Sequence, residues 1–367
     1  METFKEKLLE TCENKNLWAT ELCRLKNAKT IEDIWGVIFS NYKWFINNNI
    51  IDTKEDACLS GATISADIDL SELNIQTLVL PTVVNGSLNV QKCDLRKTKL
   101  PEKITGSLNL SGCELEGVVL PQHIGNSLFL TGCNLYNVSL PRVINGALDV
   151  SKCKLHGVDL PEYVEYSLNT SWSDVAGAVL PKYIGGSLNL SYQDITGTTL
   201  PVYVGKTLNL QGCNIQGIKM PFYIGGDIDF SGCDISGLVL PKYIGGYLYL
   251  RGCDVSGIKF PEYYEGSIDL TMCDLSGITL PRWIKGSLDL RGCDVAEVVL
   301  PEFIGESLYL NECDVSHIVL PKFVKNLLDC SGCMSENTPQ LNGYIGHCIG
   351  FEDMIANSIE LPLPQNI

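Results

Sequence analysis

A twenty-residue repeat limits what this chain can fold into more than any other feature of its sequence. A leucine-like residue followed by proline recurs through thirteen units without insertion or deletion, at Pro81, Pro101, Pro121, Pro141, Pro161, Pro181, Pro201, Pro221, Pro241, Pro261, Pro281, Pro301 and Pro321. Such a fixed period is typical of a solenoid, in which each unit forms one coil and stacks on the next. We therefore expect a repeat solenoid, mainly of β structure, over residues 57–333.

Within each unit the residue types predict where the strand and the turns lie. We number the unit from one to twenty, with Ser187 at position one. Positions two and four are apolar and position three is usually polar, which indicates a short strand with two side chains inward. Glycines cluster at positions six, eleven, nineteen and twenty, where we expect turns. Proline at position fifteen cannot donate to a strand ladder, so it predicts a corner or an unpaired side of the coil.

Position seven is the cysteine position. It holds eleven of the sixteen cysteines, at Cys93, Cys113, Cys133, Cys153, Cys213, Cys233, Cys253, Cys273, Cys293, Cys313 and Cys333. Coils about 4.8 Å apart would bring these thiols close, but in-register side chains point the same way rather than toward one another. We expect small buried thiols in the reduced state, which favours a reducing compartment. Two units in the middle of the array depart from this pattern, with Ser173 and Gln193 in place of cysteine.

The segments outside the repeat predict a cap at each end. Residues 1–56 have apolar residues at helical spacing, and Thr30 followed by Ile-Glu-Asp is a helix-start signal. We expect a helical N-terminal cap over the first coil, because the end of a stack exposes apolar surface and strand edges. A helical docking or signalling domain is the alternative. Residues 334–367 are rich in turn formers and predict a C-terminal cap and tail.

Two family resemblances follow from these motifs. The run Leu108-Asn109-Leu110-Ser111-Gly112-Cys113-Glu114-Leu115 resembles the core motif of leucine-rich repeats, and the twenty-residue period with Leu-Pro resembles the short bacterial forms, including those of secreted effectors. The run Cys233-Asp234-Ile235-Ser236-Gly237 resembles a pentapeptide repeat, which implies a right-handed quadrilateral β-helix. The fourth side of that helix would lack its small and central apolar residues. Both resemblances imply a parallel β-solenoid.

The charge balance excludes some partners. The chain has 43 acidic and 27 basic residues, and a formal net charge of −16. We expect no direct binding to nucleic acid, because the chain has too few cations to replace phosphate counterions. Repulsion by anionic lipid and the lack of a long apolar run argue against a membrane partner. We expect a cytoplasmic protein, with export without a cleaved leader as the alternative.

Position seventeen carries an aromatic row. The aromatic residues there are Tyr163, Tyr183, Tyr203, Tyr223, Tyr243, Tyr263, Trp283, Phe303 and Phe323. Earlier units hold Lys103 and His123 at this position, which indicates that it faces outward. An exposed aromatic ribbon is a candidate surface for binding a protein or a glycan. The alternative is that the rings pack on one another and shield a corner of the coil.

Position eight carries an acidic row. The candidate binding residues there are Asp234, Asp254, Asp274, Asp294 and Asp314. Like charges at coil spacing repel one another, and a basic protein surface would relieve that repulsion. The alternative is turn chemistry, because Asp and Asn accept hydrogen bonds from nearby backbone at corners.

The sequence contains no recognisable catalytic or metal site. Cys330, Cys333, His347 and Cys348 are zinc-ligand types, but Cys330 and Cys333 occupy inward positions of the last coil. The histidines are scattered, and no phosphate-binding loop is present. We expect no enzyme activity, no metal and no cofactor.

The leading interpretation is a non-catalytic protein-binding scaffold that uses the outward aromatic and acidic rows. One alternative is a nucleic-acid mimic that inhibits a DNA-binding enzyme. Another is a structural component of a phage or bacterial assembly. The sequence does not indicate the oligomeric state.

Overall fold

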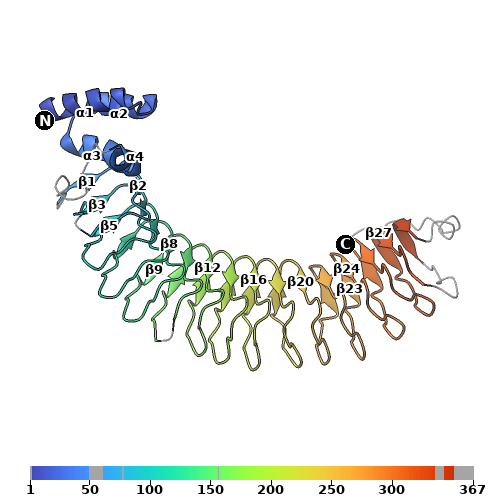
Figure 1. The fold of residues 1–367 in the computed structure, drawn as a ribbon. Helices are drawn as coiled ribbons and strands as arrows, with labels where there is room; N and C mark the ends of the chain where they lie inside the picture. Colours follow the sequence, from blue (N-terminus) through green and yellow to red (C-terminus); the bar gives the residue numbers. More distant parts are fainter. Residues whose placement is uncertain (1, 49–60, 77, 156, 335–342, 351–367) are drawn as a thin grey trace. The chain divides into compact units, whose positions relative to one another are not determined.

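The chain divides into two compact units, Met1–Ile184 and Gly185–Ile367, and each is described by itself. The structure is a computed structural model that describes residues 2–48, 61–76, 78–155, 157–334 and 343–350 (Figure 1). The predicted tail and most of the predicted C-terminal cap lie outside these described residues.

The first unit begins with helices. Their bounds are α1 (Glu2–Asn14), α2 (Ala19–Asn27), α3 (Ile31–Ser40) and α4 (Tyr42–Asn47). Helix α3 begins where the sequence predicts a helix start. The Thr30 side chain accepts a hydrogen bond from the Asp33 backbone, and the Asp33 carboxylate accepts from the Thr30 backbone at 2.9 Å. This reciprocal capping satisfies two donors that the first turn of a helix leaves without partners.

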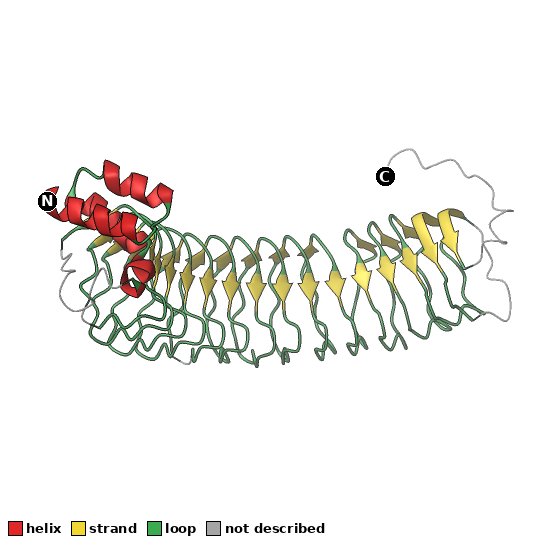
Figure 2. Cartoon of the chain, turned by 45° about the horizontal axis from the view of Figure 1, so that its top comes forward, coloured by secondary structure: helices red, strands yellow, loops and turns green. Residues whose placement is uncertain are grey.

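Helices α3 and α4 lie against the first coil. Helix α3 contacts β1 (Thr63–Ile64) and β2 (Ile68–Asp69), and α4 contacts β2. Lys43 of α4 donates to Ser71 at 2.6 Å, just beyond the end of β2. The helices (red in Figure 2) therefore cover strands of the first coil, as the apolar residues of α3 require.

The coils of the first unit carry two parallel strand ladders. The ladder at positions seventeen and eighteen holds β1, β3 (Val83–Val84), β5 (Lys103–Ile104), β7 (His123–Ile124), β9 (Val143–Ile144), β11 (Tyr163–Val164) and β13 (Tyr183–Ile184). The ladder at positions two and three holds β2, β4 (Leu88–Asn89), β6 (Leu108–Asn109), β8 (Leu128–Phe129), β10 (Leu148–Asp149) and β12 (Leu168–Asn169). Paired strands are in register, so each residue lies beside the residue twenty positions away, as Leu108 does beside Leu128.

The second unit repeats the same two ladders. At positions seventeen and eighteen lie β15 (Tyr203–Val204), β17 (Tyr223–Ile224), β19 (Tyr243–Ile244), β21 (Tyr263–Tyr264), β23 (Trp283–Ile284) and β25 (Phe303–Ile304). At positions two and three lie β14 (Leu188–Asn189), β16 (Leu208–Asn209), β18 (Ile228–Asp229), β20 (Leu248–Tyr249), β22 (Ile268–Asp269), β24 (Leu288–Asp289) and β26 (Leu308–Tyr309). The longer strand β27 (Phe323–Asp329) joins both ladders, and β28 (Tyr344–Ile349) pairs with it.

These ladders define the cross-section of a coil. The sequence predicts the strand at positions two to four, whereas the strand at positions seventeen and eighteen is an additional finding. A third line of contact consists of isolated bridges at position eight, such as that between Asp234 and Asp254. Two ladders and one line of bridges do not match the four equal sides of a pentapeptide helix. The fold is a parallel β-solenoid of the leucine-rich-repeat-like kind.

The interior and the turns follow the repeat. Leu208, Leu210, Cys213 and Ile215 are all buried, which confirms the predicted inward positions. Glycines at positions six and eleven adopt a left-handed backbone, with φ of +64° at Gly212, for example. Glycines at positions nineteen and twenty serve another purpose, because a Cβ there would overlap the backbone of the preceding coil. The backbone also bends at positions nineteen and twenty, at residues 205–206 and 225–226 for example, so the chain turns at both pairs of positions as predicted.

Candidate functional site

The position-seven thiols lie inside the coils, as predicted. All described members except Cys333 are buried, and none forms a disulfide. Each thiol donates to the carbonyl at position four of the preceding coil, as Cys233 does to Leu210 at 3.0 Å. Burial raises the pKa of Cys233 to about 12, so the thiol stays protonated. The column holds neighbouring coils together, and its buried members offer no reactive surface.

The aromatic row is stacked and half-exposed. Ring centroids lie 4.8 Å apart for Tyr163 and Tyr183 in the first unit. In the second unit the distances are 4.9 Å for Tyr203 and Tyr223, and 4.7 Å for Tyr223 and Tyr243. A further stack joins Trp283, Phe303, Phe323 and Tyr344 at 4.6–5.3 Å. The rings therefore pack on one another, as the alternative interpretation holds, and still present their outer edges to solvent.

The ladder at positions seventeen and eighteen is interrupted once in each unit. Among the described residues, no pairing joins β7 to β9, and none joins β19 to β21. The aromatic stack is interrupted at the second of these places. Tyr243 and Tyr263, on its two sides, are 39% and 46% exposed and are the most exposed members of the row in this unit. Tyr263 stacks on neither neighbour within the described chain.

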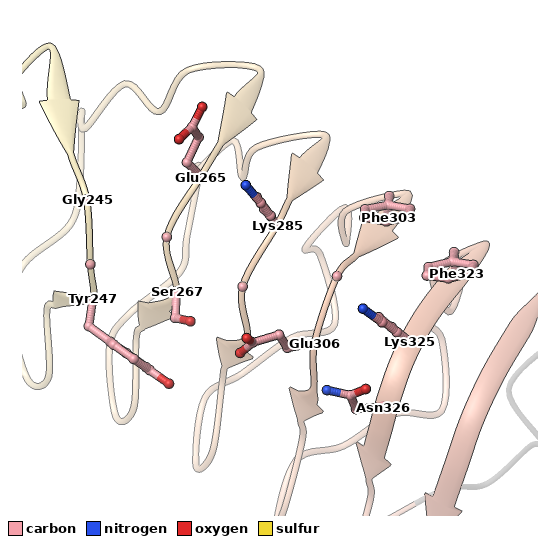
Figure 3. Close-up of a pocket in the computed structure, with 14 residues that line it drawn as sticks. Gly245, Tyr247, Glu265, Ser267, Lys285, Phe303, Glu306, Phe323, Lys325 and Asn326 are labelled. Atoms are coloured by element: carbon pink, nitrogen blue, oxygen red, sulfur yellow. The ribbon is translucent and has the colours of Figure 1, made fainter. Parts of the chain in front are cut away.

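A groove of about 640 Å³ begins at this interruption and lies beside the second aromatic stack. Figure 3 shows Phe303 and Phe323 on one side of it, and Tyr247 on the other. Glycines at positions nineteen and twenty form much of its floor, including Gly245, Gly266 and Gly286. Because glycine lacks a side chain, the backbone of these coils is open to an occupant.

Charged side chains of both signs line the groove. Glu265, Lys285 and Lys325 extend from position nineteen and Glu306 from position twenty, and all four are exposed. Ser287 donates to Glu306 at 3.1 Å. Lys285 and Lys325 form no ion pair with any residue that the structure describes. These two ammonium groups are therefore available to an external anionic group.

The acidic row at position eight is exposed and makes local turn contacts. Asp234 accepts from the Ser236 backbone at 3.0 Å and from its hydroxyl at 2.7 Å. These bonds lower the pKa of Asp234, with the hydroxyl bond as the largest cause. Asp254 and Asp294 accept only the backbone bond, at 2.9 Å and 3.0 Å. These bonds use the Oδ1 atom of each exposed residue, and no described residue donates to the Oδ2 atom, so turn chemistry and an external contact are compatible.

The structure does not bring the two predicted rows together. Position seventeen lies on the ladder at positions seventeen and eighteen. Position eight lies beyond the ladder at positions two and three, on the separate line of isolated bridges. The sequence prediction missed the groove between them, although the charged residues that replace glycine at Glu265, Lys285 and Glu306 mark its place.

Two classes of site have no support in the described part of the chain. No three histidine, cysteine or acidic side chains there gather in a geometry that could hold a metal ion. Among the same residues, every helix is too short or too polar to cross a lipid bilayer.

Comparison with known proteins gives structural similarity only. No protein-family model matches the chain, and no curated protein matches it. A solved structure of YopM, described as a leucine-rich effector protein from Yersinia pestis, matches with a TM-score of 0.42 and 14% identity, over 92% of this chain and 98% of that one. YopM from Yersinia enterocolitica WA-314 matches with a TM-score of 0.31 and 15% identity, over 92% and 99%.

Proposed function

We propose that this chain is a non-catalytic scaffold that binds a protein partner through the aromatic row of its second unit and the adjoining groove. The observation that carries the proposal is the position of the Phe303–Phe323 stack beside a groove with open glycine backbone and two available lysines. Apolar anchors next to polar groups that can pair with a partner are typical of protein interfaces.

The chemistry of the groove favours an extended protein segment as the occupant. Ring edges of Phe303 and Phe323 offer apolar contact, and the glycine floor lets another backbone approach closely. Lys285 and Lys325 lie two coils apart, about 10 Å at strand spacing. A segment with an apolar side chain and carboxylates at matching spacing would satisfy both features.

The acidic row forms a second part of the proposal. Asp254, Asp274 and Asp294 are exposed in successive coils of the second unit, and a basic surface of the partner would neutralise them. Because this row lies apart from the groove, its contribution is separable by mutation. Screening by salt should weaken this contribution more than that of the aromatic row.

The experiment first identifies the partner and then measures its affinity. A photo-crosslinking residue at Lys285 should capture the partner, whereas the same residue at Val239, which is 82% exposed at position thirteen, should not. Titration calorimetry with the purified partner then compares the wild type with Phe303→Ala/Phe323→Ala. We expect the double substitution to weaken binding at least about tenfold.

Matched variants separate the two surfaces. Tyr136→Ala removes an aromatic ring that is 70% exposed outside both rows and should leave affinity unchanged. Reversing the charge of Asp254, Asp274 and Asp294 to lysine should weaken binding mainly at low salt. Unchanged affinity in the Phe303→Ala/Phe323→Ala protein, with its circular dichroism intact, would contradict the use of the groove.

A further inference from the structure

The last described coil holds two cysteines in one turn, Cys330 at position four and Cys333 at position seven. The backbone of Cys333 donates to the Cys330 carbonyl at 3.1 Å, and Gly332 adopts a φ of +71°. This hydrogen bond closes a tight four-residue turn. The Cα atoms at the ends of such a turn lie less than about 7 Å apart, and disulfides span about 4.4–6.8 Å.

No other coil has this arrangement. Position four is Leu, Val, Phe or Thr in every earlier unit, so the other position-seven cysteines occur one to a coil. Those cysteines are 1–5% exposed and each donates to the preceding coil. Cys333 makes the same bond, to Leu310 at 2.9 Å, but it is only half-buried. It is therefore the member of the column that a small molecule can reach, and it has a second thiol beside it.

The two cysteines occupy positions four and seven of the same turn, and Cys330 is 2% exposed. Interaction with the other thiol lowers the pKa of Cys333 and raises that of Cys330. An accessible thiol beside a buried one is the arrangement that supports disulfide exchange, because the first attacks and the second resolves.

We propose that Cys330 and Cys333 form a redox-active dithiol that exchanges with low-molecular-weight disulfides. The geometry of the turn and the accessibility of Cys333 carry this proposal. It is independent of the protein-binding surfaces described above, which lie on other positions of the coil.

The exchange proceeds in two balanced steps. The Cys333 thiolate attacks one sulfur of a disulfide such as oxidised glutathione, breaks its S–S bond and releases one glutathione thiolate. The Cys330 sulfur then attacks Cys333 in the mixed disulfide, forms the Cys330–Cys333 bond and releases the second glutathione. The two protons of the protein thiols end on the two glutathione molecules. The protein dithiol is oxidised by two electrons, and the glutathione disulfide is reduced.

The test uses the full chain, incubated with oxidised glutathione and then alkylated with N-ethylmaleimide. Trypsin cleaves after Lys325 and cyanogen bromide after Met334, which separates Cys330 and Cys333 from Cys348. Mass spectrometry of the 326–334 fragment should show an internal disulfide in the wild type. The Cys330→Ser protein should stop at one bound glutathione on Cys333, and the Cys333→Ser protein should form neither product.

Two controls make the result specific. Cys313→Ser removes a buried member of the column and should leave the exchange unchanged. Cys348→Ser should also leave it unchanged, although Cys348 lies on β28, beside β27, which ends just before Cys330. An unreactive 326–334 fragment, a Cys330–Cys348 crosslink, or modification of the buried cysteines at the same rate would each overturn the proposal.

Discussion

Ser173 donates its hydroxyl to the carbonyl of Val150 at 2.8 Å, and this is the bond that cysteine makes in neighbouring coils. In the preceding unit, for example, Cys153 donates to Leu130 at 3.0 Å. The hydroxyl of serine is shorter than a thiol, yet it reaches the same acceptor. Serine and cysteine at position seven thus make the same bond between coils, and cysteine adds an apolar surface.

This relationship predicts how substitution at position seven affects stability. The Leu210 carbonyl accepts from the Cys213 backbone at 3.0 Å and from the Cys233 thiol at 3.0 Å, so both of its lone pairs are used. Cys233→Ala removes one donor and some packing, and should lower the free energy of unfolding by about 1–2 kcal/mol. Cys233→Ser keeps a donor and should cost less. Urea denaturation of both variants under reducing conditions checks this order, and equal losses would contradict it.

The sequence predicts the parts of the fold that depend on local residue patterns and misses those that depend on contacts between coils. The period, the inward positions and the start of α3 all follow from local patterns, such as the alternation at Leu208 and Leu210 or the cap at Thr30. The strand at positions seventeen and eighteen is followed by glycine in many units and not by a second inward apolar residue, so it shows no alternation of the kind seen at Leu208 and Leu210. Its pairing arises from contact between coils, which no single unit reveals.

The candidate site is harder to predict from the sequence, because it also depends on contacts between coils. The outward direction of position seventeen could be inferred, because Lys103 and His123 occupy it in early units. The groove could not, because its floor consists of glycines whose close approach to the preceding coil appears only after stacking. The interruption of the ladder between Tyr243 and Tyr263 likewise has no local signature, since both residues fit the row.

Tyr264 gives a second prediction, which concerns stability. It occupies position eighteen, where every other unit has Ile or Val, and its ring is 5% exposed. Its hydroxyl has no hydrogen-bond partner among the residues that the structure describes, and burial raises the pKa of this phenol. A buried polar group without a partner costs about 1–3 kcal/mol. Tyr264→Phe removes that cost and should raise the free energy of unfolding by about 1 kcal/mol.

The control for this prediction is Tyr243→Phe. The Tyr243 ring lies on the neighbouring coil and is 39% exposed, so removal of its hydroxyl should change stability by less than about 0.5 kcal/mol. Urea midpoints of the two variants are compared with that of the wild type. Loss of stability in Tyr264→Phe would show that the hydroxyl has a partner in solution.

The buried thiols predict that stability falls in alkaline solution. Burial raises the pKa of Cys273, Cys293 and Cys313 from 9.0 to about 11. Between these values the unfolded chain loses its thiol protons while the folded chain keeps them, so ionisation favours the unfolded state. Stability that is fully present below pH 9 is therefore lost as the pH rises toward about 11. Urea denaturation across this range, under reducing conditions, should show the fall. Replacing the three cysteines by serine should make it shallower, because tyrosine and lysine titrate equally in both proteins. Identical slopes would mean that these thiols ionise in the folded state.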